Sequence, residues 1–252
     1  MDFTFYADLV GTSVLYATSP THAYERLNEY YNAVFHGLSA YYNESDTRKV
    51  EMFSDSLVVY GDNPQLFLST MAPVYMNLLS KGLLLRGGMV DGLLHYDARI
   101  TTRNFQKYLP DSDVLARSIA LERLVKGARI VLNPVIAESF LSSHREWLTL
   151  QGYASNRNPG NIDLLLQRSL VPLATGSAYE LLYPLLGLSE ESTIEMRKDE
   201  MDYQVRHLPR DVSMHYSETK AVLVHSKERL RDHHAQQGVA PYVAQGAPSG
   251  ER

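Results

Sequence analysis

The stretch FTFYADLVGTS, residues 3–13, decides how the rest of the sequence is interpreted. From Phe3 to Val10 it is apolar and aromatic, interrupted only by Thr4 and Asp8, and a Gly-Thr-Ser turn follows. This composition predicts a buried strand that ends in a loop. A carboxylate in such a strand is costly unless a cation lies beside it, so Asp8 is a candidate functional residue.

A second acidic residue lies between two apolar runs. The stretch VEMFSDSLVVYGD, residues 50–62, predicts a hairpin with Ser54 to Ser56 at its tip. If this hairpin lies beside the first strand, Asp8 and Asp55 converge on a divalent ion, and the backbone carbonyl of Leu9 can be a third ligand. The residues alone leave open an ordinary alternative, a strand end and a hairpin turn that bind nothing.

The polar turn after Asp8 is a candidate phosphate site. Gly11, Thr12 and Ser13 open toward a helix, so their backbone N–H groups can hold a phosphate beside the metal. Without the two aspartates, this turn is weak evidence for phosphate binding.

Hydrophobic spacing predicts alternating strands and helices over the first half of the chain. Glycines 87, 88 and 92 inside a strand pattern indicate bulges or close approach of another backbone. The expected elements are a strand over 3–10, a helix over 22–42, a hairpin over 50–62, a helix over 65–81, a strand pair within 83–97, a helix over 111–126 and a strand over 128–136. This order predicts an α+β sandwich with helices over a sheet.

The remaining sequence is expected to extend this core. We expect a catalytic domain over residues 1–140, a helical extension over 141–232 that packs on the core or on a dimer partner, and a disordered tail over 233–252.

Composition narrows the function. The 252-residue chain has 24 basic and 29 acidic residues and a net charge of −5, so it has no basic field to attract nucleic acid or anionic lipid. Cysteine is absent, which excludes disulfides, thiolate zinc sites and cysteine nucleophiles. No apolar run is long enough to span a membrane, and the start of the chain does not resemble a secretory signal. We therefore expect a cytoplasmic protein.

The residues around both aspartates resemble a known family. Residues 6–13, YADLVGTS, and 53–56, FSDS, look like the two metal-binding motifs of class III nucleotide cyclases. Residues 86–97, RGGMVDGLLHYD, resemble the strand pair that follows in bacterial cyclases, and residues 115–122 and 128–133 resemble their next helix and strand. The resemblance covers roughly residues 1–135 and is closest to the pyrimidine (uridylate or cytidylate) cyclases of Pycsar antiphage systems.

This resemblance implies a fold, a reaction and an assembly. The fold is a ferredoxin-like βααββαβ sandwich with a helical C-terminal extension. Asp8, Asp55 and the Leu9 carbonyl hold two Mn²⁺ or Mg²⁺ ions for cyclisation of a nucleoside triphosphate, UTP before CTP, with release of pyrophosphate. Sites form at the interface of a head-to-tail homodimer, and a separate effector protein reads the cyclic product. The residues assigned to substrate binding are Gly11, Thr12, Ser13, Glu51 and Phe53.

The sequence departs from the family at the transition-state residues. Purine cyclases carry an Asn and, four residues later, an Arg on the helix after the strand pair, where this chain has Ala116 and Ala120. We expect Arg117, Arg99 or Arg103 to supply the positive charge instead, because arginine binds phosphate through two parallel hydrogen bonds. The alternative for each single arginine is a solvated surface charge. With Ala116 and Ala120 at the transition-state positions, a further alternative is a catalytically inactive, cyclase-like nucleotide sensor.

The base specificity rests on two further positions. Glu51, four residues before Asp55, matches guanylate cyclases, but its usual partner position holds the apolar Leu109. Leu109 cannot complete a hydrogen-bond pair with a purine, so a smaller pyrimidine pocket is expected, in which uracil N3–H donates to Glu51. A guanylate or adenylate cyclase remains the alternative.

Overall fold

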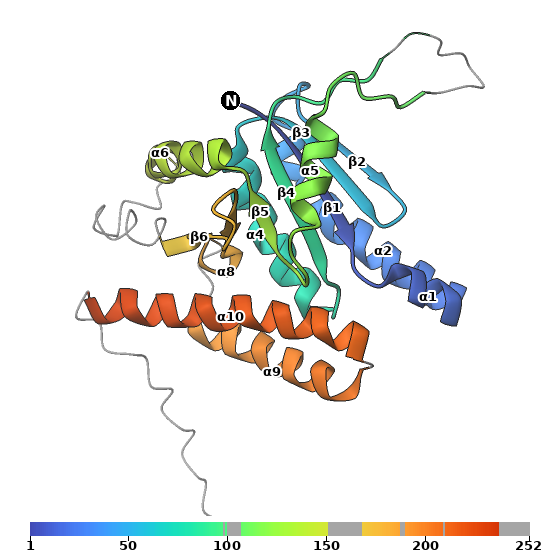
Figure 1. The fold of residues 1–252 in the computed structure, drawn as a ribbon, viewed down its shortest axis with the longest axis vertical. Coiled ribbons are helices and arrows are strands. Elements are labelled where there is room, and N and C mark those ends of the chain that lie inside the picture. The colour runs from blue at the N-terminus through green and yellow to red at the C-terminus, as the bar shows by residue number, and fades with distance from the viewer. Residues whose placement is uncertain (98, 100–106, 151–167, 187–189, 209, 237–252) are drawn as a thin grey trace, which may run out of the picture.

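The structure, a computed structural model, describes residues 1–97, 99, 107–150, 168–186, 190–208 and 210–236. Within these residues one seven-stranded sheet carries helices on both faces, as Figure 1 shows. The strands, in sheet order, are β2 (Lys49–Phe53), β3 (Ser56–Asp62), β1 (Asp2–Leu9), β4 (Leu85–Asp91), β5 (Ile130–Leu132), β7 (Tyr179–Leu181) and β6 (Leu170–Pro172).

The first four strands have the ferredoxin-like arrangement. β1 lies in the middle and pairs antiparallel with both β3 and β4, while β2 pairs with β3. Helical segments connect β1 to β2 and β3 to β4, which is the βαββαβ order. The helices are α1 (Thr12–Thr18), α2 (Pro20–Gly37), α3 (Ser39–Tyr42), α4 (Pro64–Ser80), α5 (Val114–Glu122), α6 (Pro134–Leu150), α8 (Tyr183–Leu186), α9 (Glu191–His207) and α10 (Arg210–Gln236). The expected α+β fold class is confirmed.

Alternation along β1 separates the two faces of the sheet. Phe3, Phe5 and Leu9 are buried in the main core with residues of α2 and α4. Successive strand residues point to opposite faces, so Tyr6 and Asp8 face the side that α5 covers. In Figure 1, α5 lies in front of the sheet. The acidic side chain of Asp8 therefore points away from the main core.

A glycine in β4 lets α5 pack directly on the sheet. A Cβ on Gly88 would lie 2.4 Å from the Ser118 carbonyl oxygen and 2.7 Å from the Glu122 nitrogen. Ser118 Oγ donates to the Gly88 carbonyl at 2.6 Å and accepts from the Tyr6 N–H at 2.8 Å. The expected close approach of another backbone is confirmed at Gly88.

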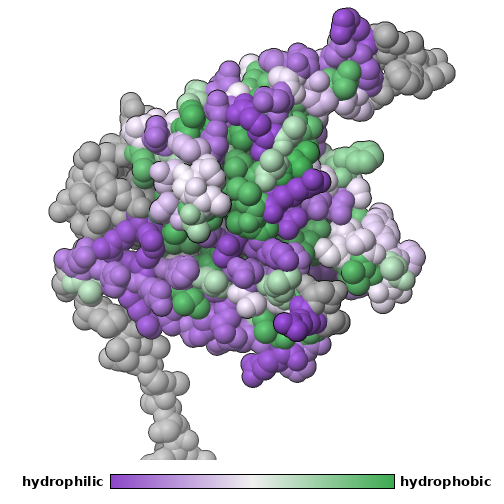
Figure 2. All heavy atoms as spheres, viewed as in Figure 1, coloured by the Kyte–Doolittle hydropathy of each residue, from purple (hydrophilic) through white to green (hydrophobic). Residues whose placement is uncertain are grey.

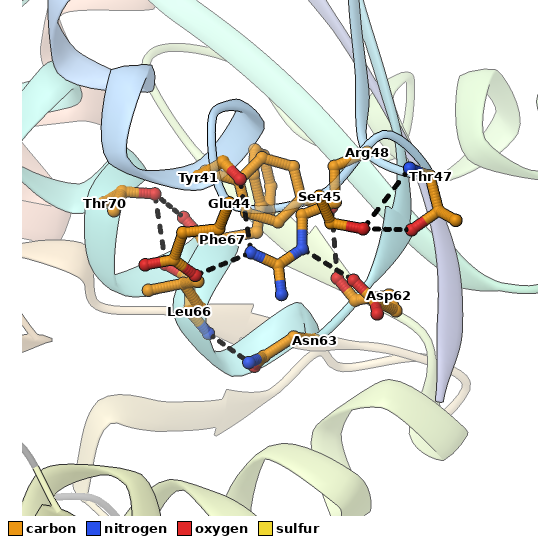
Figure 3. A network of polar contacts seen from close by, with 10 residues as sticks. All are labelled: Tyr41, Glu44, Ser45, Thr47, Arg48, Asp62, Asn63, Leu66, Phe67 and Thr70. Atoms are coloured by element: carbon orange, nitrogen blue, oxygen red, sulfur yellow. Dashed lines mark hydrogen bonds and ion pairs between the residues drawn. The ribbon is translucent and has the colours of Figure 1, made fainter.

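Arg48 fixes the end of the β2–β3 hairpin that lies opposite its tip. Its Nε donates to Asp62 Oδ1 at 2.6 Å, and its Nη1 donates to Glu44 Oε2 at 2.8 Å. The guanidinium also lies 5.1 Å from the centre of the Tyr41 ring (Figure 3). Tyr41 in turn donates to the Asp62 carbonyl, so α3 and the hairpin are joined at one point.

The predicted strand pair within residues 83–97 is wrong. β4 is a single strand, and the described residues between β4 and α5 contain an isolated bridge between Tyr96 and Pro110 in place of a second strand. Both edges of β4 are already taken, by β1 and by β5, so a following strand has no place beside it. Gly92, at φ +105°, turns the chain out of the sheet.

Other predicted elements are shorter or divided. The helix expected over 22–42 is divided into α2 and α3, and the helix over 111–126 is α5. The strand expected over 128–136 is β5 alone, because Pro134 begins α6.

The C-terminal extension also contributes to the sheet. β6 and β7 form an antiparallel pair, and β7 joins the edge of β5. α9 and α10 pack against each other, and Thr219 Oγ1 of α10 accepts from the Ala128 N–H at 2.8 Å. α10 extends through Gln236, and the rest of the expected tail lies outside the described residues.

The hydropathy of the surface differs between the C-terminal helices and the sheet. Figure 2 shows hydrophilic residues predominating on α9 and α10, whereas hydrophobic residues gather over the sheet beside α5. None of the described helices is long and apolar enough to cross a bilayer.

Candidate active site

The two candidate metal-binding aspartates meet at the end of β1. Asp55 lies in the two-residue turn between β2 and β3, as the sequence predicted, and its carbonyl accepts the Leu9 N–H at 3.0 Å. Asp8 lies opposite Ser56 in the strand register. Ser54 adopts a left-handed conformation at φ +56°, which is uncommon for a residue other than glycine. The hairpin tip is thus held directly against Asp8 and Leu9.

The environment of Asp8 disfavours its charge. Burial is the largest cause, followed by the negative charge of Asp55, and together they raise the pKa of Asp8 to about 6. A hydrogen bond from Ser56 Oγ at 3.2 Å and the positive charge of Arg86 oppose this rise. A nearby cation would remove this electrostatic cost.

The arrangement fits a hard divalent cation. Neither Asp8 nor Asp55 forms an ion pair with any described residue. The described part of the chain contains no group of three or more His, Cys, Asp or Glu residues that could hold a metal ion by themselves. The donors are two carboxylates and the Leu9 carbonyl, which accepts Thr12 Oγ1 at 2.9 Å and keeps a second lone pair. Mg²⁺ is commonly held by one or two carboxylates together with substrate phosphates.

The turn after β1 is ordered by its own contacts. Gly11 has φ +85°, and its carbonyl accepts the N–H groups of Val14 and Leu15 at the start of α1. Thr12 is buried, whereas Ser13 is exposed. Phe53, beside the hairpin tip, is 83% exposed. These four candidate substrate-binding residues therefore lie at the same end of the sheet as Asp8.

Glu51 is bound by two tyrosines within the chain. Tyr60 Oη donates to its Oε1 and Tyr96 Oη donates to its Oε2, both at 2.8 Å. Burial, and then the bond to Glu51, raise the pKa of both phenols, so they remain protonated donors. Sequence reasoning missed both tyrosines. Glu51 faces Val58, and Tyr60 lies two residues further on the same face, so the hairpin register signals the first contact but not the second.

The candidate arginines lie away from the aspartates of the same chain. Arg117 donates to Asp91 Oδ1 at 3.2 Å and to the Asp91 carbonyl at 3.0 Å, and it forms an ion pair with Asp113. Asp91 pairs with Phe3, at the other end of β1 from Asp8. Five strand residues separate these levels, about 17 Å along β1.

The other two arginines are also not placed beside Asp8. Arg99 donates three hydrogen bonds of 2.9 Å to the Asp97 carboxylate, two from its guanidinium and one from its backbone N–H, in the segment that leaves the sheet after Asp91. Arg103 lies outside the described residues. Ala116 and Ala120 are exposed on the outer face of α5, and Leu109 is 52% exposed.

One ion pair near Asp8 was not anticipated from the sequence. Arg86 of β4 lies directly opposite Asp8 in the register and pairs with Glu122, the last residue of α5. No local pattern pairs a strand residue with a residue 36 positions later. This contact depends on the packing of α5 against β4.

No family model matches the sequence, and no curated protein matches it. Among solved structures, adenylate cyclases from Trypanosoma brucei in their monomeric state align at 12% identity over 72% of this chain and 89% of theirs, with a TM-score of 0.51. The guanylyl cyclase Cya2 aligns at 16% identity over 55% of this chain and 77% of that chain, with a TM-score of 0.45. The adenylyl cyclase CyaB from P. aeruginosa aligns at 15% identity over 56% and 80%, with a TM-score of 0.43.

The likeness to the T. brucei enzymes is a likeness of fold. The chain has the fold of the class III nucleotide cyclases.

Proposed function

We propose that this protein is a metal-dependent nucleotide cyclase that converts a pyrimidine nucleoside triphosphate, UTP before CTP, to the 3′,5′-cyclic monophosphate and pyrophosphate. The observation that carries this proposal is the placement of Asp55 beside the end of β1, in a fold of the cyclase class. The Asp55 carbonyl accepts the Leu9 N–H, and the Asp55 charge helps to raise the pKa of Asp8. Asp8 is a carboxylate whose charge is disfavoured by its surroundings, and binding of a cation gives a physical reason to keep it there.

In this proposal, some residues bind the metal ions and others orient the phosphates. Asp8, Asp55 and the Leu9 carbonyl would hold the divalent ions, and the N–H groups of residues 11–13 would orient the phosphates. Mn²⁺ or Mg²⁺, when bound, lowers the pKa of the attacking hydroxyl and neutralises charge on the leaving group. The ribose 3′-oxygen forms a bond to the α-phosphorus as the bond to pyrophosphate breaks, and the hydroxyl proton passes to water. No protein nucleophile is needed.

We propose that the positive charge that stabilises the transition state comes from an arginine of a second copy of this chain. Within one chain Arg117 is anchored about 17 Å along β1 from Asp8, too far for both to contact one α-phosphate. A head-to-tail homodimer would bring the aspartates of one chain to an arginine of its partner, whether Arg117, Arg99 or Arg103.

The proposed preference for a pyrimidine is supported by the environment of Glu51. Guanine would present two donors, its N1–H and its amino group, and would need both acceptor positions that the two phenol hydrogen bonds leave on the carboxylate. Uracil presents only its N3–H. Uracil would therefore use only one of the two remaining acceptor positions of Glu51.

The biological setting is proposed from the family resemblance. The cyclic product would be an alarm signal in antiphage defence, made in the cytoplasm and read by a separate effector protein.

A second candidate function is a catalytically inactive nucleotide sensor. It is favoured by the exposed Ala116 and Ala120 and by the bonding of Arg117 to Asp91 and Asp113. A guanylate or adenylate cyclase is the alternative within the enzyme class.

The test is to incubate the purified protein with Mn²⁺ and with ATP, GTP, CTP or UTP separately, and to identify products by chromatography and mass spectrometry. A cyclic pyrimidine monophosphate supports the proposal. A cyclic purine would keep the reaction and overturn the substrate, and no product from any nucleotide would favour the sensor.

A further inference from the structure

Arg86 occupies a position from which it should bind Asp8. The two residues are direct partners in the antiparallel pair of β4 and β1, so their side chains lie on the same face of the sheet. Cβ atoms of such partners are about 5 Å apart. A guanidinium this close to a carboxylate ordinarily forms an ion pair, and here that pair would occupy a proposed metal ligand.

The structure shows Arg86 held elsewhere. Its Nε donates to Glu122 Oε1 in an ion pair, and its Nη1 donates to the Val125 carbonyl at 3.2 Å. The Glu122 side chain is only 3% exposed, so it has almost no alternative partner in solvent. In the described residues Asp8 has one side-chain hydrogen bond, from Ser56, and none from Arg86.

The backbone determines this geometry. The absence of a side chain at Gly88 lets α5 lie on β4, which brings the last residue of the helix over Arg86. Because a buried carboxylate without a partner is energetically unfavourable, Glu122 favours the ion pair with the Arg86 guanidinium.

We propose that Glu122 is a positioning residue of the metal site, which restrains Arg86 so that Asp8 remains free to bind a divalent cation. The inference rests on the proposed function only for the metal-binding role of Asp8. Loss of the Glu122 charge releases the guanidinium toward its strand partner, where it competes with the cation.

The test measures Mn²⁺ binding by isothermal titration calorimetry on the full chain without nucleotide. Glu122→Gln is expected to raise the Kd for Mn²⁺ by about tenfold, the lower range for loss of a residue that orients a metal ligand. The double variant Arg86→Gln/Glu122→Gln removes the competitor and is expected to restore the Kd to within about threefold of the parent. A merely structural role of Glu122 would not give this rescue.

Matched variants separate the possible outcomes. Glu180→Gln breaks a comparable ion pair, between Arg129 (14% exposed) and Glu180 (6% exposed), and is expected to leave the Kd unchanged. Glu122→Asp, one methylene shorter, is the second variant if Glu122→Gln does not fold, and it should raise the Kd in the same direction. Circular dichroism checks the fold of each.

Asp8→Asn distinguishes failure of this inference from failure of the proposed function. If Asp8→Asn abolishes Mn²⁺ binding while folded Glu122→Gln and Glu122→Asp both bind as the parent does, the role of Glu122 is overturned and the metal site stands. If Asp8→Asn binds Mn²⁺ as the parent does, the metal site and this inference both fail.

Discussion

Asp8 is costly to the folded chain as long as no cation lies beside it. Its pKa rises from 3.8 to about 6 on folding, which by linkage corresponds to roughly 3 kcal/mol. Solvent screening of a half-buried group reduces this to about 1 kcal/mol. Because the pKa of Asp8 is higher in the folded protein than in the unfolded one, this contribution to the free energy of unfolding is fully present below pH 3.8. It is lost as the pH rises through about 6.

We therefore predict that Asp8→Asn stabilises the metal-free protein and abolishes cyclisation. In EDTA at pH 7.5, chosen as a test condition, its Tm should exceed that of the parent by about 3 °C. Mn²⁺ should raise the Tm of the parent but not that of the variant. Differential scanning fluorimetry with and without Mn²⁺ measures both effects. A variant less stable than the parent in EDTA, or equally stabilised by Mn²⁺, would contradict this reading of Asp8.

Tyr96 and Tyr60 are predicted to set the base preference through Glu51. Tyr96→Phe removes one of the two hydrogen bonds to the carboxylate and frees an acceptor for guanine. The ratio of kcat/KM for GTP to that for UTP should rise by about tenfold. Tyr24→Phe, at a residue 70% exposed, is the control and should leave the ratio unchanged. An unchanged ratio in Tyr96→Phe would contradict the proposed role of Glu51 in selecting the base.

At the residue scale, the sequence predicts candidates from the energetic cost of a carboxylate in an apolar segment, and it does not predict contacts that depend on tertiary packing. Asp8 and Asp55 are predicted as candidates because carboxylates in apolar segments need a compensating partner. The contacts of Arg86 with Glu122 and of Tyr96 with Glu51 join residues 36 and 45 positions apart. Such pairings follow from packing and leave no local pattern.

At the scale of elements, α10 is joined to the core by a buried hydroxyl. Thr219 Oγ1 accepts the Ala128 N–H at 2.8 Å and donates to the His215 carbonyl. Thr219→Val leaves the buried Ala128 N–H without this partner, and should destabilise the protein by about 1–3 kcal/mol. Thr18→Val is the matched control, since Thr18 also donates to a carbonyl four residues earlier but is exposed. Urea denaturation should separate the two variants, and equal stabilities would contradict this docking.

Element boundaries were predictable where periodicity was long. α4, with eleven buried residues over four to five turns, matches the expected helix over 65–81 within one residue at each end. β6 and β7 were missed because three residues are too few to show alternation. The second strand expected after β4 was wrong because the sheet has no free edge there, which only the assembled topology determines.

At the scale of the whole molecule, the separation of Asp8 from Arg117 predicts a shared site. If each site uses one chain's aspartates and its partner's arginine, Asp8→Asn and an inactive arginine variant should complement each other. Random exchange of subunits places one intact site in half of the dimers, so the mixture should recover about a quarter of the parent activity. The arginine variants to try are Arg117→Ala, Arg99→Ala and Arg103→Ala. No recovery with any of them would contradict the shared site.

The central claim is metal-dependent cyclisation at Asp8 and Asp55, and its most direct measurement compares the parent with Asp55→Asn on UTP and Mn²⁺. Products are identified by mass spectrometry, and pyrophosphate is quantified in parallel. We predict 3′,5′-cyclic UMP and pyrophosphate in equal amounts from the parent and neither from Asp55→Asn. Equal product from both proteins, or no cyclic product from the parent with any of the four nucleoside triphosphates, would contradict the claim.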